Sequence, residues 1–288
     1  MKKILIIDGY NMIHRCRFAW GGGLADGESQ IIYNFFRVLK STIAQFSPDS
    51  VYFALDGMPK KRLEEDPNYK ANRVVDTDDP QVVDYWTNFR LQKRFIIKSL
   101  RENYPVSVVY HPFNEADDLI YYLVKHHHSA DSVTVLSSDT DFIQLLNEFD
   151  KVKLYNPISK KYREKTEYDY VAWKAMVGDK ADNIPGVRGI GKVGATKILL
   201  KEGALDERRQ DPTFDKAFSK SFDLIKFIDL KDEESNIDVM KAALDIGAIE
   251  AEFEVLGFDS MLSNSYFSSY EEEYINLENR GKNEIDSN

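Results

Sequence analysis

Asp139 and Asp141 stand one residue apart, directly after an apolar run, in the stretch VTVLSSDTDFIQLL at 133–146. The run predicts a buried strand and the apolar spacing beyond it predicts a helix, so both acids lie in the turn between them. Carboxylates this close repel each other unless a cation intervenes, and hard oxygen ligands suit Mg²⁺ or Mn²⁺. The alternative is that one Asp caps the helix and the other is solvated. The pair alone leaves both interpretations open.

The elements that position this pair form an alternating series. Apolar runs at 1–8, 51–56, 106–110, 133–136 and 152–155 predict strands, and helical patterns such as 29–46 lie between them. This alternation indicates an α/β fold with a mostly parallel central sheet flanked by helices. Ligands of such sheets bind outside the carboxyl ends of the strands.

Further acids follow the other predicted strands at that same edge. They are Asp8, Asp56 and Asp139 at strand ends, and Glu115, Asp117 and Asp118 in the first turn of a helix for which Asn114 is the expected N-cap. About six carboxylates at one edge would be strongly destabilising without a cation. We therefore expect a metal site rather than six separate solvated caps.

A basic segment lies between two of the acid-tipped strands. It contains KKR at 60–62, the motif YKANR at 69–73, and an expected helix at 82–102 with Lys and Arg at spacings of three and four. Such a stripe is most often a solvated face. Its position between the strands predicts instead that it overhangs the metal edge, where a polyanionic substrate would need both features.

A glycine-rich loop at 186–191 follows an expected helix at 166–177, which Thr166 would cap, and opens another helix. Asp179 and Asp182 precede this loop as two further acids in a turn. Glycine lets backbone N–H groups approach an anion, and a helix N-terminus adds its dipole. No strand leads into the loop, so gripping a phosphodiester backbone fits better than dinucleotide binding. A glycine turn that serves only helix packing is the alternative.

The charge of the chain is unevenly distributed. Its 288 residues carry a net charge of −10, but residues 229–288 hold 16 acidic and 4 basic residues, and the other 228 have a net charge of +2. The acidic total therefore does not exclude nucleic acid as a partner. In the acidic stretch we expect one helix at 236–246 and a solvated end at 271–273 and 281–288.

Two observations bear on the compartment. The single Cys16 excludes a disulfide framework and fits a reducing cytosol. The apolar run at 4–7 is too short for a signal peptide or a membrane span. We expect a cytoplasmic location, which is the host cytoplasm if the chain is encoded by a phage, and no membrane contact.

The ordered motifs resemble the 5′-nuclease family of flap endonucleases and 5′→3′ exonucleases, especially its stand-alone bacteriophage type (phage ribonuclease H or 5′-exonuclease). The resemblance covers about residues 1–200. It rests on IIDGYN, ALDG, YKANR, NEADD, SSDTDFIQLL and MVGDKADNIPGVRGIGKVGATKIL, in that order. The proline-containing motif that follows YKxxR in polymerase-linked members is replaced here by VVDTDDPQVVDYWTNF.

The resemblance implies a site for two Mg²⁺ ions, for which Mn²⁺ can substitute. Asp8, Asp56, Glu115, Asp117 and Asp139 would serve the first metal, and Asp141, Asp179 and Asp182 the second, with Asp118 in the first or second shell. Lys70 and Arg73 match catalytic residues at the base of a helical arch. The DNA-binding residues would be Tyr69, Arg188, Gly189, Gly191, Lys192 and Lys197, with K⁺ at the Gly189/Gly191 loop as in some members.

The implied organisation is a nuclease domain at 1–165 with the arch at about 58–101. A helix–three-turn–helix duplex-binding region at 166–230 and an acidic region at 231–288 follow. The implied substrate is DNA with a 5′ flap, fork or nicked primer duplex, including RNA–DNA primers. Replication proteins would bind through the C-terminal region, and a monomer is favoured.

Two other functions remain open at this point. A PIN-type ribonuclease shares the acid-edged sheet, but it predicts fewer acids and no glycine-rich helical hairpin. A non-catalytic DNA-junction-binding protein predicts missing ligands or a missing Lys70/Arg73 pair, and neither is missing.

Overall fold

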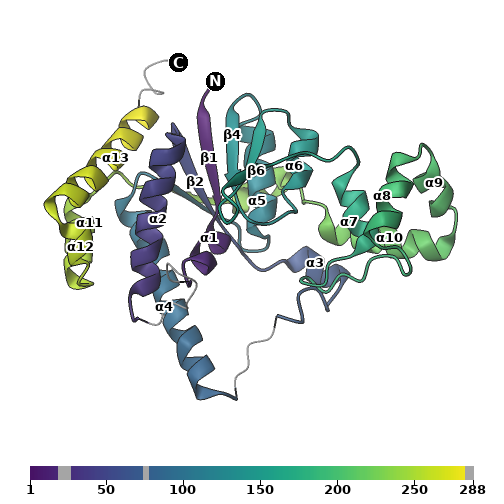
Figure 1. Ribbon diagram of the computed structural model, residues 1–288, viewed down its shortest axis with the longest axis horizontal. Helices are drawn as coiled ribbons and strands as arrows, with labels where there is room; N and C mark the ends of the chain where they lie inside the picture. Colours follow the sequence, from purple (N-terminus) through teal and green to yellow (C-terminus); the bar gives the residue numbers. More distant parts are fainter. Residues whose placement is uncertain (19–26, 74–77, 283–288) are drawn as a thin grey trace.

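A seven-stranded sheet forms the centre of the computed structural model, which describes residues 1–18, 27–73 and 78–282 (Figure 1). The strand order is β6-β5-β4-β1-β2-β3-β7. The five central strands are parallel, and the edge strands β6 and β7 run antiparallel to their neighbours. The strands are β1 Lys3–Asp8, β2 Ser50–Leu55, β3 Ser107–Tyr110, β4 Ser132–Leu136, β5 Val152–Asn156, β6 Lys161–Arg163 and β7 Asp238–Met240. The predicted, mostly parallel sheet is confirmed.

Helices cover both faces of the sheet, because alternate side chains of the buried strands point to opposite sides. Leu5 and Ile7 of β1 belong to one core cluster, and Ile4 and Ile6 belong to the other. The first face is covered by α1 Gly9–Arg15, α2 Gln30–Phe46 and α4 Pro80–Asn103, and the second by α5 Ala116–Tyr122, the π-helical turn η1 Leu123–His127 and α6 Ile143–Glu148.

The C-terminal region is integrated into the sheet fold. After the 3₁₀ turn η2 Lys231–Asn236, β7 pairs with β3, where the sequence pattern had predicted a helix at 236–246. That prediction is wrong, because pairing with an open sheet edge overrides local propensity. The helices α11 Ile246–Val255, α12 Asp259–Leu262 and α13 Asn264–Lys282 follow, and α13 lies beside α2 in Figure 1.

The acidic end is more ordered than predicted. Residues 271–273 lie within α13, whose Tyr270 and Tyr274 are fully buried against Tyr104. These aromatic contacts attach the helix to the first-face core. Residues 283–288 lie outside the described part of the chain.

A smaller helical unit extends from the second face. It comprises α7 Tyr170–Val177, α8 Lys192–Leu200, α9 Ala204–Arg209 and α10 Pro212–Ile225, whose apolar side chains form a separate cluster. Asp169 caps α7 by accepting from the amide of Ala172, so the helix begins later than the predicted Thr166 cap. This unit covers the region predicted to bind duplex DNA, and that assignment stays a prediction.

The predicted arch corresponds to two helices on either side of residues 74–77. The first is α3 Lys60–Glu65, followed by turns through residue 72, and the second is α4. Residues 74–77, within the acidic segment that replaces the proline-containing motif, lie outside the described residues.

No helix in the described ranges is both long enough and apolar enough to span a bilayer.

Candidate metal centre and nucleic-acid interface

Asp8, Asp56 and Asp139 lie at the carboxyl ends of three neighbouring strands. Asp8 ends β1 and accepts hydrogen bonds from Ser137 Oγ at 2.7 Å and from the amide of Asn11 at 3.2 Å. Asp56 follows β2 and accepts from the amide of Ala116 at 2.8 Å. Asp139 follows β4, and its own amide donates to Ser137 Oγ at 3.1 Å. Local hydrogen bonds therefore orient these acids at one edge of the sheet.

The strand-edge acids perturb one another. Burial, followed by the charge of Asp56, raises the pKa of Asp8 to about 7. Burial and then the charges of Asp139 and Asp8 raise the pKa of Asp117 well above its ordinary value, and burial also raises the pKa of Asp56. Among the described residues, no Lys or Arg forms an ion pair with any of these four acids. A cation from outside the protein would relieve this repulsion.

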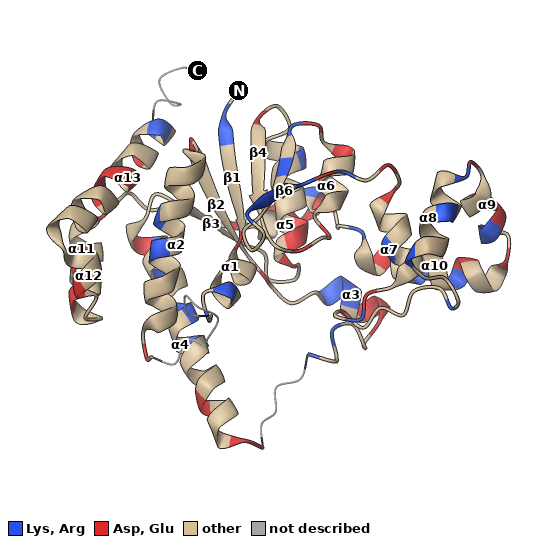
Figure 2. Ribbon diagram, viewed as in Figure 1, with Lys and Arg blue, Asp and Glu red and all other residues tan. Residues whose placement is uncertain are grey.

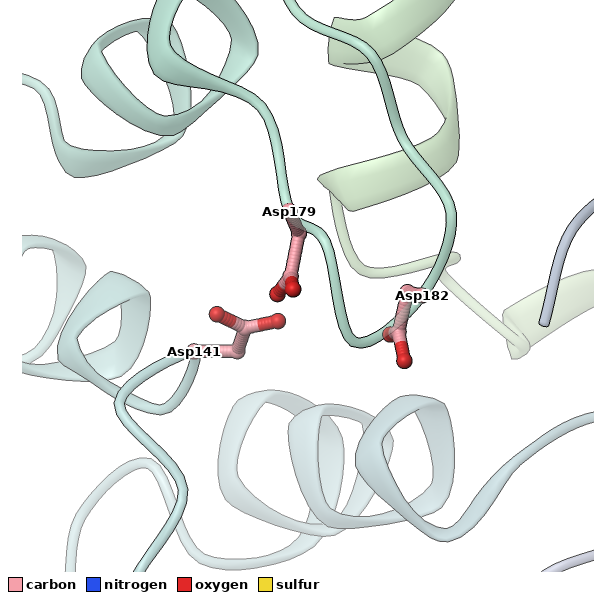
Figure 3. A group of neighbouring side chains, drawn as sticks. All are labelled: Asp141, Asp179 and Asp182. Atoms are coloured by element: carbon pink, nitrogen blue, oxygen red, sulfur yellow. The ribbon is translucent and has the colours of Figure 1, made fainter. Parts of the chain in front are cut away.

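A second, tighter carboxylate group lies beside this edge. Asp141, Asp179 and Asp182 each offer an oxygen, and these three oxygens lie within 4.8 Å of one another, which no other group of three candidate ligands achieves in the described ranges. Figure 3 shows the carboxylates of Asp141 and Asp179 facing each other, with Asp182 on the same loop as Asp179. The structure therefore brings together the three acids predicted for the second metal, and the strand-edge acids form no group this tight among the described residues.

The loop that carries two of these acids has a required backbone shape. Gly178 has φ +80 and Gly186 has φ +68, and each would place a Cβ within 2.6 Å of the opposite strand of the loop. Asp179 and Ile184 exchange two backbone hydrogen bonds across the loop. The amide of Asp179 donates to the carbonyl of Ile184 at 2.8 Å, and the amide of Ile184 donates to the carbonyl of Asp179 at 2.7 Å. The two glycines thus let the loop fold back closely enough to present Asp179 and Asp182 together.

Lys174 of α7 is a charged residue of the site that sequence reasoning missed. It is buried, and its Nζ contacts Asp141 and lies 2.6 Å from Asp179 Oδ2. Burial and the charge of Asp139 raise the pKa of Asp141 to about 7, whereas Lys174 holds the pKa of Asp179 below its usual value despite partial burial. The available signal was a lysine inside an otherwise apolar helix, YVAWKAMV.

Lys70 and Arg73 both lie against acids of the site. Lys70 Nζ contacts Glu115 and lies 3.7 Å from Asp182 Oδ2, and Arg73 contacts Asp182. The amide of Lys70 also donates to the carbonyl of Asp182 at 3.0 Å. The arch base is thereby tied to the second acid group, which places two cations beside both groups of acids.

Arg62 of α3 forms ion pairs with both Glu115 and Asp118. It donates to both oxygens of Asp118, at 2.6 and 2.8 Å, and to Glu115 at 3.0 Å, with further bonds to the carbonyls of Leu224 and Lys226. Asp118 also accepts from the amide of Ile228. Its oxygens are therefore occupied by protein donors, which fits the second of the two roles expected for Asp118, a position behind the metal ligands. Glu115 rather than Asn114 caps α5, in a reciprocal arrangement with Asp118.

The predicted DNA contacts divide into exposed and buried residues. Arg188, Gly189, Gly191, Lys192 and Lys197 are all exposed, and a Cβ at either glycine would meet no atom within 4 Å. The loop is thus open to an approaching backbone. Tyr69, in contrast, is 5% exposed and donates to Glu115 at 2.9 Å, so the structure does not support it as a DNA contact.

Basic and acidic residues are unevenly distributed over the helices. Figure 2 shows Lys and Arg on α3 and on the unit that contains α8, and shows Asp and Glu on α12 and α13. Lys and Arg also lie on α2 and α4. The negative net charge therefore belongs largely to helices that lie across the sheet from the α7–α10 unit.

These features define an α/β fold with a carboxylate-rich sheet edge next to a basic helical unit. Residues 3–177 match the family described as 5′-3′ exonuclease, N-terminal resolvase-like domain. This match covers more than half of the chain, and the chain belongs to that family.

Two relatives illustrate its range. The chain is 28% identical to a 5′-3′ exonuclease of Aquifex aeolicus over 288 residues, which covers 91% of this chain and 94% of the relative. It is 30% identical to DNA polymerase I of Caldicellulosiruptor bescii over 231 residues, which covers 73% of this chain. The chain spans only about a quarter of the length of that polymerase, 25%.

Solved structures share the fold. A complex of the bacteriophage T5 flap endonuclease with DNA and metal ions has a TM-score of 0.66 and 19% identity, covering 96% of this chain and all of the other. A zinc-bound T5 5′-exonuclease has a TM-score of 0.62 and 23% identity, covering 78% of this chain and 86% of the other. These similarities confirm the predicted fold class.

Proposed function

We propose that this chain is a structure-specific, Mg²⁺-dependent 5′-nuclease. It would hydrolyse phosphodiester bonds at or near the 5′ ends and flaps of DNA, and of RNA–DNA primers, during primer removal. The single observation that carries the proposal is the presence of two neighbouring acid groups. Asp8, Asp56, Asp117 and Asp139 have no ion-pair partner among the described residues, and three acids of the second group have oxygens within 4.8 Å of one another. Lys70 lies against Glu115 of the first group, and Lys70 and Arg73 lie against Asp182 of the second. Family membership supports the same reaction class.

The chemistry of the donors fits divalent cations. The oxygens of Asp8, Asp56, Asp117 and Asp139, with Glu115, would hold one ion, and those of Asp141, Asp179 and Asp182 would hold the other. Two such ions supply an activated water and neutralise charge on the leaving oxygen. The burial and mutual repulsion that raise the pKa of Asp8 and Asp117 are a disadvantage that bound Mg²⁺ or Mn²⁺ removes.

Lys70 and Arg73 would act on the scissile phosphate. In the structure both cations are held by acids that belong to the proposed metal site. From these positions the two side chains would reach the phosphate oxygens of a bound substrate, where each could stabilise developing charge by a few kcal/mol. Arg62 and Asp118 keep Glu115 and the arch base in place for this exchange.

The exposed loop around Gly189 and Gly191 would bind the duplex. Its N–H groups and the side chains of Arg188, Lys192 and Lys197 suit phosphates, so recognition would be by shape. The affinity for duplex DNA would fall steeply as the salt concentration rises. A K⁺ ion held by loop carbonyls belongs to the same proposal. Contacts of the acidic region with replication proteins and a monomeric state are further proposals.

A cleavage assay on a 5′-flap duplex with Mg²⁺ or Mn²⁺ tests the function. We expect cleavage near the junction by the wild type, and a loss of at least about 100-fold for Asp141→Asn with DNA affinity retained. Retained junction binding without cleavage would identify a non-catalytic binding protein. Cleavage confined to single-stranded RNA would identify a PIN-type ribonuclease.

A further inference from the structure

Lys174 lies between the two carboxylates of the second acid group that face each other. Its side chain is 8% exposed, and those of Asp141 and Asp179 are 13% and 19% exposed. The ammonium contacts one oxygen of each acid. A buried cation held by two partly buried carboxylates is a strong local interaction, since removing it would leave both acids uncompensated.

The same carboxylates are the candidate ligands of a divalent ion. Mg²⁺ binds carboxylate oxygens at roughly 2.0–2.1 Å, so an ion held by Asp141 and Asp179 would lie within a few ångströms of the position that Nζ now occupies. The repulsion between an ammonium and a divalent cation at that separation is large where water is scarce. The two cations therefore exclude each other from this space.

The strand-edge acids provide the contrast. Asp8, Asp117 and Asp139 have no ion-pair partner among the described residues, so an ion held by these three acids displaces no protein cation from them. Glu115 is the paired member of that group, with Lys70 and Arg62. The second position is the one whose two facing carboxylates share a single protein cation, so the two positions should differ in their affinity for a divalent ion.

We propose that Lys174 is the resident counter-cation of the second metal position, that a divalent ion must displace it from between Asp141 and Asp179, and that this competition makes the second position the weaker of the two. The inference rests on the proposed two-metal function. In the absence of metal, Lys174 holds α7 and the following loop against the turn after β4. Its flexible four-carbon stem lets the ammonium leave without movement of the helix.

Calorimetric titration with Mn²⁺, in parallel with electron paramagnetic resonance of bound Mn²⁺, tests the competition without any catalytic readout. We expect two classes of position in the wild type. Lys174→Met should tighten the weaker class by at least about tenfold, the size of effect that a neighbouring cation has on a carboxylate's charged form. Lys174→Arg keeps the charge and should not tighten it. Lys282→Met, an exposed lysine on α13 paired with Glu278, is the matched control.

A labelling experiment on the wild type keeps the inference testable if Lys174→Met does not fold. Acetylation of Lys174 by an amine reagent, followed by mass spectrometry, should be slow without metal and rise over the Mn²⁺ concentrations that fill the weaker position. Lys282 should react equally at all concentrations. Unchanged reactivity of Lys174 across that range would overturn the inference.

The outcomes separate the two proposals. If the wild type binds no divalent ion, the proposed function and the inference both fail. If two ions bind but Lys174→Met leaves the weaker affinity unchanged or lowers it, the competition is refuted while the metal-dependent function stands. In that case Lys174 positions the ligands instead.

Discussion

Arg62 grips both oxygens of Asp118 at 2.6 and 2.8 Å, with side-chain exposures of 4% and 0%. The pair connects α3, at the base of the arch, to the start of α5, where Glu115 is the N-cap and Asp117 lies in the first turn. Bidentate geometry fixes the orientation as well as the charge. The arch and the acid edge are thereby joined as one unit within the protein.

Breaking this pair should destabilise the fold. Arg62→Met leaves Asp118 as a buried, uncompensated acid and leaves Glu115 with Lys70 as its remaining cation, so we expect a loss of about 3–5 kcal/mol in the free energy of unfolding by urea. Asp118→Asn should also lower stability but leave the number of bound Mn²⁺ ions unchanged. A lost metal position in Asp118→Asn would restore the metal-ligand role predicted from the sequence.

Removing the Lys70 ammonium should affect turnover more than affinity. Lys70→Ala should lower kcat on a 5′-flap duplex by about 100- to 1000-fold, as for loss of one group that stabilises the transition state. The Kd for the same duplex, measured by fluorescence anisotropy in Ca²⁺, should change little. A change in Kd alone would make Lys70 a positioning contact rather than a catalytic one.

The stability of the metal-free protein should fall as pH rises from about 4 to about 7. The pKa values of Asp8 and Asp141 are both raised to about 7, so in this range the folded state binds more protons than the unfolded chain, whose Asp pKa is about 3.9. Each group contributes up to about 1.4 kcal/mol per pH unit.

Differential scanning calorimetry between pH 4.5 and 8 measures this slope. Saturating Mg²⁺ should flatten it, and so should the double variant Asp8→Asn/Asp141→Asn. Asp179 has a lowered pKa and acts in the opposite direction, since its contribution is lost as pH falls below about 4. A metal-free Tm that rises between pH 5 and 7 would contradict the prediction.

Removing a phosphate contact at Lys192 should weaken duplex binding without changing specificity. For Lys192→Ala we expect lower affinity for duplexes of any sequence. The slope of the logarithm of the binding constant against the logarithm of the salt concentration should be reduced in size by about one. Titrations at several salt concentrations measure both, with Lys282→Ala as the control. An unchanged slope would remove Lys192 from the interface.

Sequence patterns alone were enough to predict that acids at the ends of the central strands lie at one edge of the sheet. Alternating strands and helices imply parallel strands, and parallel strands end at one side, so Asp8, Asp56 and Asp139 could be brought together without coordinates. The glycine-rich loop after α7 could also be predicted from local sequence, because glycine readily adopts the positive φ that Gly186 and Gly189 have.

Tertiary structure decided which group neutralises each acid. Lys174 meets Asp141 across 33 residues, and Arg62 meets Asp118 across 56, and no local period reports contacts at such separations. The same holds for β7, which became a strand because the edge of β3 was available to it. Local chemistry placed the carboxylates at the sheet edge, whereas long-range packing supplied their counter-charges, since an ion pair depends on distance in space rather than on spacing in the chain.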